Sequence, residues 1–143
     1  MLFKRVSRAQ PEQVFIVAKN VSGSTLTAGY SAVFDISASV DGVRVTQASS
    51  FDLQAFAGVA DSDIANNDYG LLQVYGYRSS VYLYSSTGSS VAGDNLSVVA
   101  AQWGLTPATT LGTGKSFGFL CEAVAASSSS QFHTTAKCFI RAL

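Results

Sequence analysis

The sequence predicts an all-β fold: a single-domain antiparallel β-sandwich or small barrel-like fold with at most one or two short helical turns. Apolar and polar residues alternate with a period of two, and no window keeps helical periodicity over three turns. Segments rich in β-branched and aromatic residues are separated by clusters of Gly, Asn, Asp and Ser. A chain of 143 residues can bury a sizeable core. We assign residues 1–10 to an extended N-terminal arm and residues 11–143 to one β domain.

Eight segments have the pattern of strands. They are Val14–Lys19, Ser31–Ser37, Val43–Thr46, Leu71–Tyr77, Ser80–Ser85, Leu96–Trp103, Ser116–Ala125 and Thr135–Ala142. Asp41-Gly42 predicts a tight hairpin between "ISASV" and "VRVTQ". The stretch "LTPATTLGTGK", residues 105–115, lacks alternation and predicts an exposed loop.

The last two predicted strands fit one antiparallel register, in which they fold back about Ser129 and Ser130. The pairs expected to face each other are Cys121 and Cys138, Phe119 and Ile140, Ala123 and Ala136, Phe117 and Ala142, and Glu122 and Lys137. This register makes one face apolar and places an ion pair on the other. A slip by one residue would turn the apolar set to the other face.

The stretch "GVADSDIANNDYGLLQVYGY", residues 58–77, concentrates Asp61, Asp63 and Asp68. A metal site is one reading, but the EF-hand spacing is absent. The favoured reading is turn chemistry, in which Asp61 caps one helical turn, Ile64 points inward and residues 66–68 form the turn before a strand.

No set of residues with the pattern of a catalytic site is found, and we expect neither enzyme activity nor a cofactor. Cys121 and Cys138 are not spaced as CxxC, so they are read as buried thiols, with a cross-strand disulfide as the alternative. The single histidine, His133, follows "SSSSQF" and is read as a solvated loop residue rather than a general base.

The charge balance gives no reason to expect nucleic acid or a membrane surface as a partner, because nine Lys and Arg residues offset nine Asp and Glu residues. No run is long and apolar enough for a signal peptide or a membrane span. A third of the basic residues lie in the first eight positions, where Leu2 and Phe3 are apolar anchors beside Lys4 and Arg5. The arm is therefore read either as a disordered terminus or as a segment that folds onto a partner.

Aromatic residues form the other candidate site. They are Tyr69, Tyr75, Tyr77, Tyr82, Tyr84 and Trp103. Tyrosine suits half-buried sheet faces and protein interfaces, where the ring packs and the hydroxyl stays hydrated. Protein interfaces are the favoured interpretation, and stacking against sugars is the alternative.

Three segments resemble the small decoration, or cement, proteins of tailed-bacteriophage capsids. They are "KNVSGSTLTAG", "FAGVADSDIANNDYGLLQVYGY" and the ending "AKCFIRAL". The resemblance implies a virion protein made in the host cytoplasm that binds the major capsid protein on the capsid exterior. It also implies a homotrimer that stabilises the shell, with the arm residues Leu2, Phe3, Lys4 and Arg5 as capsid contacts. The alternatives are a carbohydrate-binding β-sandwich, a tail-tube subunit and a head-completion subunit.

Overall fold

The computed structural model describes residues 2–3, 12–37, 41–85, 89–108, 115–125 and 132–142. The all-β prediction is confirmed, since none of these residues lies in a helix. The strands are β1 (Leu2–Phe3), β2 (Gln13–Asn20), β3 (Ser31–Phe34), β4 (Arg44–Thr46), β5 (Phe56–Ala60), β6 (Tyr69–Ser85), β7 (Asn95–Val98), β8 (Leu105–Ala108), β9 (Gly118–Leu120) and β10 (Phe132–Arg141).

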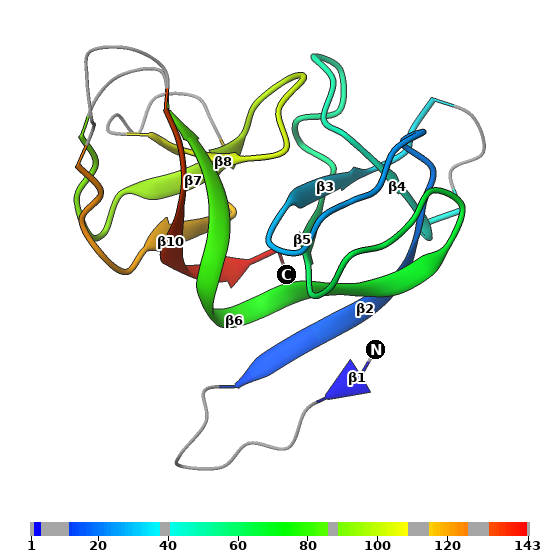
Figure 1. The fold of residues 1–143 in the computed structure, drawn as a ribbon, viewed down its shortest axis with the longest axis horizontal. Helices are drawn as coiled ribbons and strands as arrows, with labels where there is room; N and C mark the ends of the chain where they lie inside the picture. The colour runs from blue at the N-terminus through cyan, green and yellow to red at the C-terminus, as the bar shows by residue number, and fades with distance from the viewer. Residues whose placement is uncertain are drawn as a thin grey trace.

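The strands form two small barrels that share β6. The sheet has the order β1-β2-β4-β3-β5-β6-β10-β9-β7-β8, and the further pairings β2–β6 and β6–β8 close each half onto β6. One barrel therefore contains β2, β4, β3, β5 and β6, and the other contains β6, β10, β9, β7 and β8. Figure 1 shows these halves as two lobes with β6 running along both. The β2–β4 and β6–β8 pairs are parallel, so the sheet is mixed rather than wholly antiparallel.

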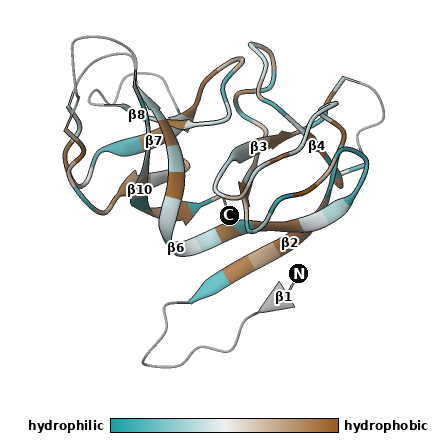
Figure 2. Cartoon of the chain, in the orientation of Figure 1, coloured by the Kyte–Doolittle hydropathy of each residue, from teal (hydrophilic) through white to brown (hydrophobic). Residues whose placement is uncertain are grey.

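Each barrel has an apolar core. The first core is built on Ala18, Leu26, Ala57, Ile64 and Leu72, and the second on residues such as Leu83, Leu96, Leu105, Leu120 and Ile140. Figure 2 shows apolar residues in the middle of β2 and at intervals along β6. Barrel closure pairs the strands edge to edge, which leaves few free strand edges for unwanted association.

The segments predicted as Leu71–Tyr77 and Ser80–Ser85 are one continuous strand, β6, with a sharp bend. Its first half pairs with β2 and β5, and its second half pairs with β10. Gly76 lies at the bend with a φ of 105°. A side chain there would collide with the carbonyl oxygen of Glu12, so the close approach of β2 requires glycine.

Three strands were not predicted: β1, which lies in the predicted arm, β5 and β8. All of β5 is buried because it lies between the two cores: Phe56 and Val59 enter one, and Ala57 and Ala60 enter the other. Such a strand lacks the alternation that identifies a half-exposed one. The predicted loop at 105–115 was wrong in its first part, since Leu105–Ala108 is β8 and pairs with β7. Pro107 hid this strand, because proline is rare inside sheets.

The predicted hairpin register was wrong by one residue. Cys138 lies opposite Leu120, Phe139 opposite Phe119 and Ile140 opposite Gly118. Leu120, Cys138 and Ile140 enter the core, whereas the rings of Phe119 and Phe139 stack outside it at 5.3 Å. The two outward aromatic residues have a common face only in this register.

The predicted ion pair at this hairpin is present despite the shift. Lys137 Nζ lies 3.0 Å from Glu122 Oε2, and the backbone N–H of Lys137 donates to Glu122 Oε1. That backbone hydrogen bond is the main reason that the pKa of Glu122 is lowered. Cys138 lies opposite Leu120 rather than Cys121, and both thiols are free. The prediction of buried thiols is confirmed for Cys138 and wrong for Cys121, which is exposed.

The predicted hairpin between β3 and β4 exists, but it is not tight. Val33 and Phe34 pair with Thr46 and Val45, and the chain between the strands runs from residue 35 to residue 43. Asp41 Oδ1 accepts hydrogen bonds from the backbone N–H groups of Val43 and Arg44, and Gly42 within this turn has a φ of 69°. These bonds lower the pKa of Asp41.

The acidic stretch at residues 61–68 is a loop that polar side chains hold in place. Ile64 points inward as predicted and forms an isolated bridge with Leu26. Asn67 has a φ of 69° in the turn before β6, which confirms that part of the prediction. The predicted helical cap at Asp61 was wrong, because this carboxylate binds Arg78 instead.

Candidate interaction surfaces

Five ring side chains form a continuous row, which we call the aromatic row: Trp103, Tyr30, Tyr82, His133 and Tyr84. Successive ring centroids along it are 5.8, 4.7, 5.5 and 5.3 Å apart. Three of the predicted residues are thereby brought together. Tyr30 was not among the predicted residues, and the prediction that His133 is a loop residue was wrong, because His133 lies in β10.

Backbone contacts hold the aromatic row in place. The N–H and the hydroxyl of Ser31 both donate to the carbonyl oxygen of Trp103 at 2.8 Å. The N–H of Tyr82 donates to the carbonyl oxygen of Gly29 at 2.9 Å. In the β6–β10 ladder, Tyr84 lies opposite His133. The row therefore joins segments of both barrels, and only the tertiary structure could reveal it.

Burial raises the pKa of the Tyr82 hydroxyl, and the adjacent Tyr30 adds to the shift. The Tyr82 phenol is therefore a neutral hydrogen-bonding group under ordinary conditions.

The other predicted tyrosines lie elsewhere. Tyr75 contacts Phe139 edge to face at 5.2 Å, and Tyr77 lies opposite Phe139 in the ladder. Tyr69 is 65% exposed at the start of β6, and Lys19 Nζ lies 5.8 Å from its ring centroid. The six aromatic residues predicted as one candidate interface thus occupy three separate places.

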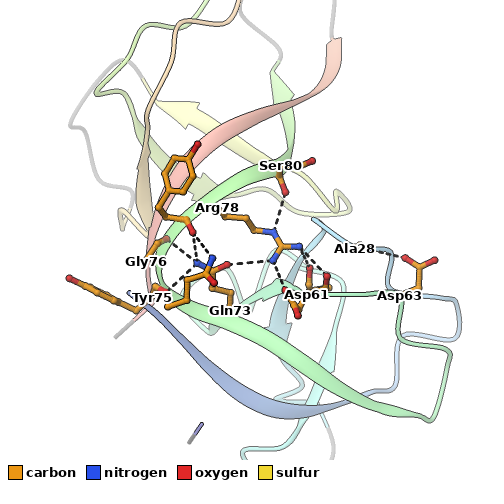
Figure 3. Close-up of polar contacts among 11 residues, drawn as sticks. Ala28, Asp61, Asp63, Gln73, Tyr75, Gly76, Arg78 and Ser80 are labelled. Carbon is orange, nitrogen blue, oxygen red and sulfur yellow. Dashed lines mark hydrogen bonds and ion pairs between the residues drawn. The ribbon is translucent and has the colours of Figure 1, made fainter. Parts of the chain in front are cut away.

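A polar node centred on Arg78 fixes the bend of β6 (Figure 3). Its guanidinium donates to Asp61 Oδ1 at 3.1 Å, to the Ala60 carbonyl at 2.8 Å and to the Ser80 carbonyl at 3.1 Å. The buried Gln73 donates to the carbonyl oxygens of Tyr75, Gly76 and Tyr77. The acidic residue that first suggested a metal site therefore has a structural role.

Phe51 is an exposed apolar side chain that the sequence analysis did not select. Its side chain is 90% exposed, although hydrogen bonds hold the loop that carries it. The N–H of Ser49 donates to Asp52 Oδ1 at 2.6 Å, and the N–H of Ala55 donates to the Asp52 carbonyl at 2.7 Å. An ordered, projecting aromatic residue is typical of an interface anchor.

The arm pairs with the domain through its backbone. Leu2 lies opposite Phe15 and Phe3 opposite Val14, so that β1 extends the sheet beside β2 (Figure 1). Lys4 and Arg5, the other two predicted contact residues, lie outside the described residues. Val17, which follows the β1-paired segment of β2, is 51% exposed.

The described residues contain no group of three or more His, Cys, Asp or Glu side chains arranged to hold a metal ion. Burial raises the pKa of the Cys138 thiol to about 12. Partial desolvation also raises the pKa of the Cys121 thiol, although Cys121 as a whole is exposed. Neither thiol is therefore activated as a nucleophile. Within the same part of the chain, no helix has the length and apolar character needed to cross a bilayer.

No protein-family profile matches the chain, and a comparison with curated protein sequences finds no match either. Among solved structures, the fold is similar to the crystal structure of the head fiber gp8.5 N base in bacteriophage phi29. The TM-score is 0.52 at 17% sequence identity, and the match covers 91% of this chain and 95% of that chain. The two chains therefore share a fold over nearly their whole lengths.

Proposed function

We propose that this protein is a structural component of a bacteriophage head, which binds the outside of the capsid and stabilises the shell by bridging its subunits. The observation that supports the proposal most is the fold shared, over 91% of the chain, with the base of a phage head fiber. The segment that resembles phage decoration proteins spans β5, the loop at residues 61–68 and the first half of β6. It thus forms part of the framework of that fold.

The physical mechanism is multivalent clamping. A subunit that contacts several capsid proteins adds weak contacts together, because the second contact forms within an already bound complex. If the mature shell is bound more tightly than other arrangements, binding shifts the equilibrium toward it. This role requires no chemical step.

Two surfaces supply the contacts in this proposal. The arm residues Leu2, Phe3, Lys4 and Arg5 contact the major capsid protein, whose surface we expect to be acidic where it meets them. Phe51 is the anchor between copies of this chain in a homotrimer. Burying a phenylalanine side chain contributes about 2–3 kcal/mol. Phe51 is the most exposed large apolar side chain among the residues that the structure describes.

Sedimentation with empty phage shells that lack this protein tests the proposal. We expect the full chain to pellet with the shells, and no pelleting would contradict the proposed function. Deleting residues 2–8 should abolish attachment while circular dichroism shows a folded domain. Normal occupancy by the truncated protein would contradict the role of the arm.

The Phe51 contact is tested by the mass of the protein in solution. Phe51→Ser should shift the trimer toward monomer in analytical ultracentrifugation. Val91→Ser is the matched control, because Val91 is also an exposed apolar residue, at 60% exposure, and lies away from Phe51 in sequence. Equal behaviour of the two variants would remove Phe51 from the interface.

A further inference from the structure

The aromatic row has no part in the proposed capsid contacts, yet it is the largest connected group of rings among the described residues. Its residues come from both barrels and from the shared strand β6. Binding sites are common where two structural units meet, because each unit contributes side chains to one place.

The aromatic row is uncharged apart from the titratable His133. Within the described part of the chain, the ion pairs and the cation–ring contact all involve other side chains. Single-stranded nucleic acids require cations along their backbone beside the stacking rings. The row therefore does not have the composition of a site for a nucleic acid or another polyanion.

The rings differ in what they offer a ligand. Tyr30 and Tyr82 each contact a ring on both sides, so they present edges and phenolic hydroxyls. Trp103 ends the row, and among the rings that the structure describes it contacts Tyr30 alone. Trp103, Tyr30 and Tyr82 are all partly accessible to solvent. An indole next to two tyrosine rings combines an apolar ring with hydrogen-bonding groups.

Neutral sugars have the matching chemistry. A pyranose ring has an apolar face of C–H groups and a rim of hydroxyls. The apolar face packs on an aromatic ring, and the hydroxyls exchange hydrogen bonds with phenols. We propose that the aromatic row is a binding site for a neutral glycan, in which Trp103 carries a sugar ring and the Tyr30 and Tyr82 hydroxyls bind its hydroxyl groups.

The site is ordered before the ligand arrives. The backbone of Trp103 is fixed by the two Ser31 hydrogen bonds and that of Tyr82 by the Gly29 carbonyl. The two rings are held by their contacts with Tyr30 and, for Tyr82, with His133. Side chains that are already held in place lose little conformational entropy on binding, so weak contacts give measurable affinity. Thr135 lies opposite Tyr82 in the ladder and adds a further exposed hydroxyl beside the row.

The fluorescence of Trp103 provides a direct test, since it is the single tryptophan of the chain. The purified full chain is titrated with soluble neutral oligosaccharides of glucose, galactose, mannose and N-acetylglucosamine. We expect a saturable change with at least one of them, unaffected by ionic strength because the ligand is uncharged. No response to any of the four sugars would overturn the proposal.

Variants assign the response to the row. Tyr82→Ala should weaken binding about tenfold, the upper end of what one aromatic contact contributes. Tyr82→Phe keeps the packing of the ring and removes the hydroxyl, so it tests the same binding site if the alanine variant does not fold. Tyr75→Ala is the control from the separate cluster beside Phe139 and should bind normally. Unchanged affinity in both Tyr82 variants would overturn the assignment.

Two further ligands exclude other classes of partner. Heparin and a proline-rich peptide should leave the fluorescence unchanged, and a response to either one without a response to sugars would refute the glycan site. Shell sedimentation is a separate measurement on the same protein. A chain that pellets with shells but ignores sugars refutes only the glycan site, and the reverse result refutes only the proposed function.

Discussion

Replacing Gly76 by alanine tests whether the bend of β6 depends on the close approach of β2. Gly76 has a φ of 105°, and it pairs with Gln13 of β2 and with Ile140 of β10. A methyl group at this position would meet the carbonyl oxygen of Glu12. The alanine variant therefore bears both backbone strain and a collision with a neighbouring strand.

Gly93 separates these two costs. Its φ is 97°, close to that of Gly76, but nothing lies within 4 Å of the position that a Cβ would occupy. Gly93→Ala should lose about 1–2 kcal/mol of unfolding free energy from strain alone. Gly76→Ala should lose about 2 kcal/mol more, because moving Glu12 disrupts the β2–β6 pairing at Gln13 and the hydrogen bond from Gln13 Nε2 to the Tyr77 carbonyl.

Urea denaturation followed by circular dichroism measures both variants. With a slope of about 1–3 kcal/mol per molar urea, the extra loss in Gly76→Ala should lower its midpoint by about 1 M relative to Gly93→Ala. Equal midpoints for the two variants would refute the reasoning, since the collision would then cost nothing.

Three further predictions concern the interior. Arg78→Met should cost about 2–4 kcal/mol in urea denaturation because Gln73 Oε1 loses its Arg78 donor and the Ala60 carbonyl loses one of its donors, although it still accepts from the Gly29 N–H. Asp61→Asn should cost under about 1 kcal/mol, since the Asp61 side chain is 46% exposed. Equal costs would contradict the central role of Arg78. Ile64→Ala should cost about 2–5 kcal/mol, and a smaller loss in thermal unfolding would show that this buried side chain is poorly packed. For Cys138, burial raises the folded-state pKa from 9.0 to about 12. The contribution of this thiol to the free energy of unfolding is therefore complete below pH 9 and is lost as the pH rises to 12. Three pH units at about 1.4 kcal/mol each give an upper limit of about 4 kcal/mol, and Cys138→Ala should show a correspondingly smaller fall in stability over that range.

The local pattern of the sequence determined the strand content and most strand positions. Period-two alternation identifies half-exposed strands such as β2, because one face of the strand contacts solvent and the other contacts the core. It fails for β5, which contacts a core on each side. Turn chemistry was similarly local, and it placed the turn at residues 66–68 correctly because the Asn67 conformation depends on neighbouring residues.

Register and ring contacts were decided by the tertiary structure. Alternation predicted a register of the C-terminal strands that was wrong by one residue, and in the observed register Phe119 and Phe139 stack outside the core. The closure of two barrels on β6 requires pairings between distant strands, and local periodicity carries no information about them. The same closure brings Tyr30 and Trp103 together, although they are 73 positions apart in the sequence. The residue types therefore suggested an aromatic site, but only the tertiary packing decided which rings form it.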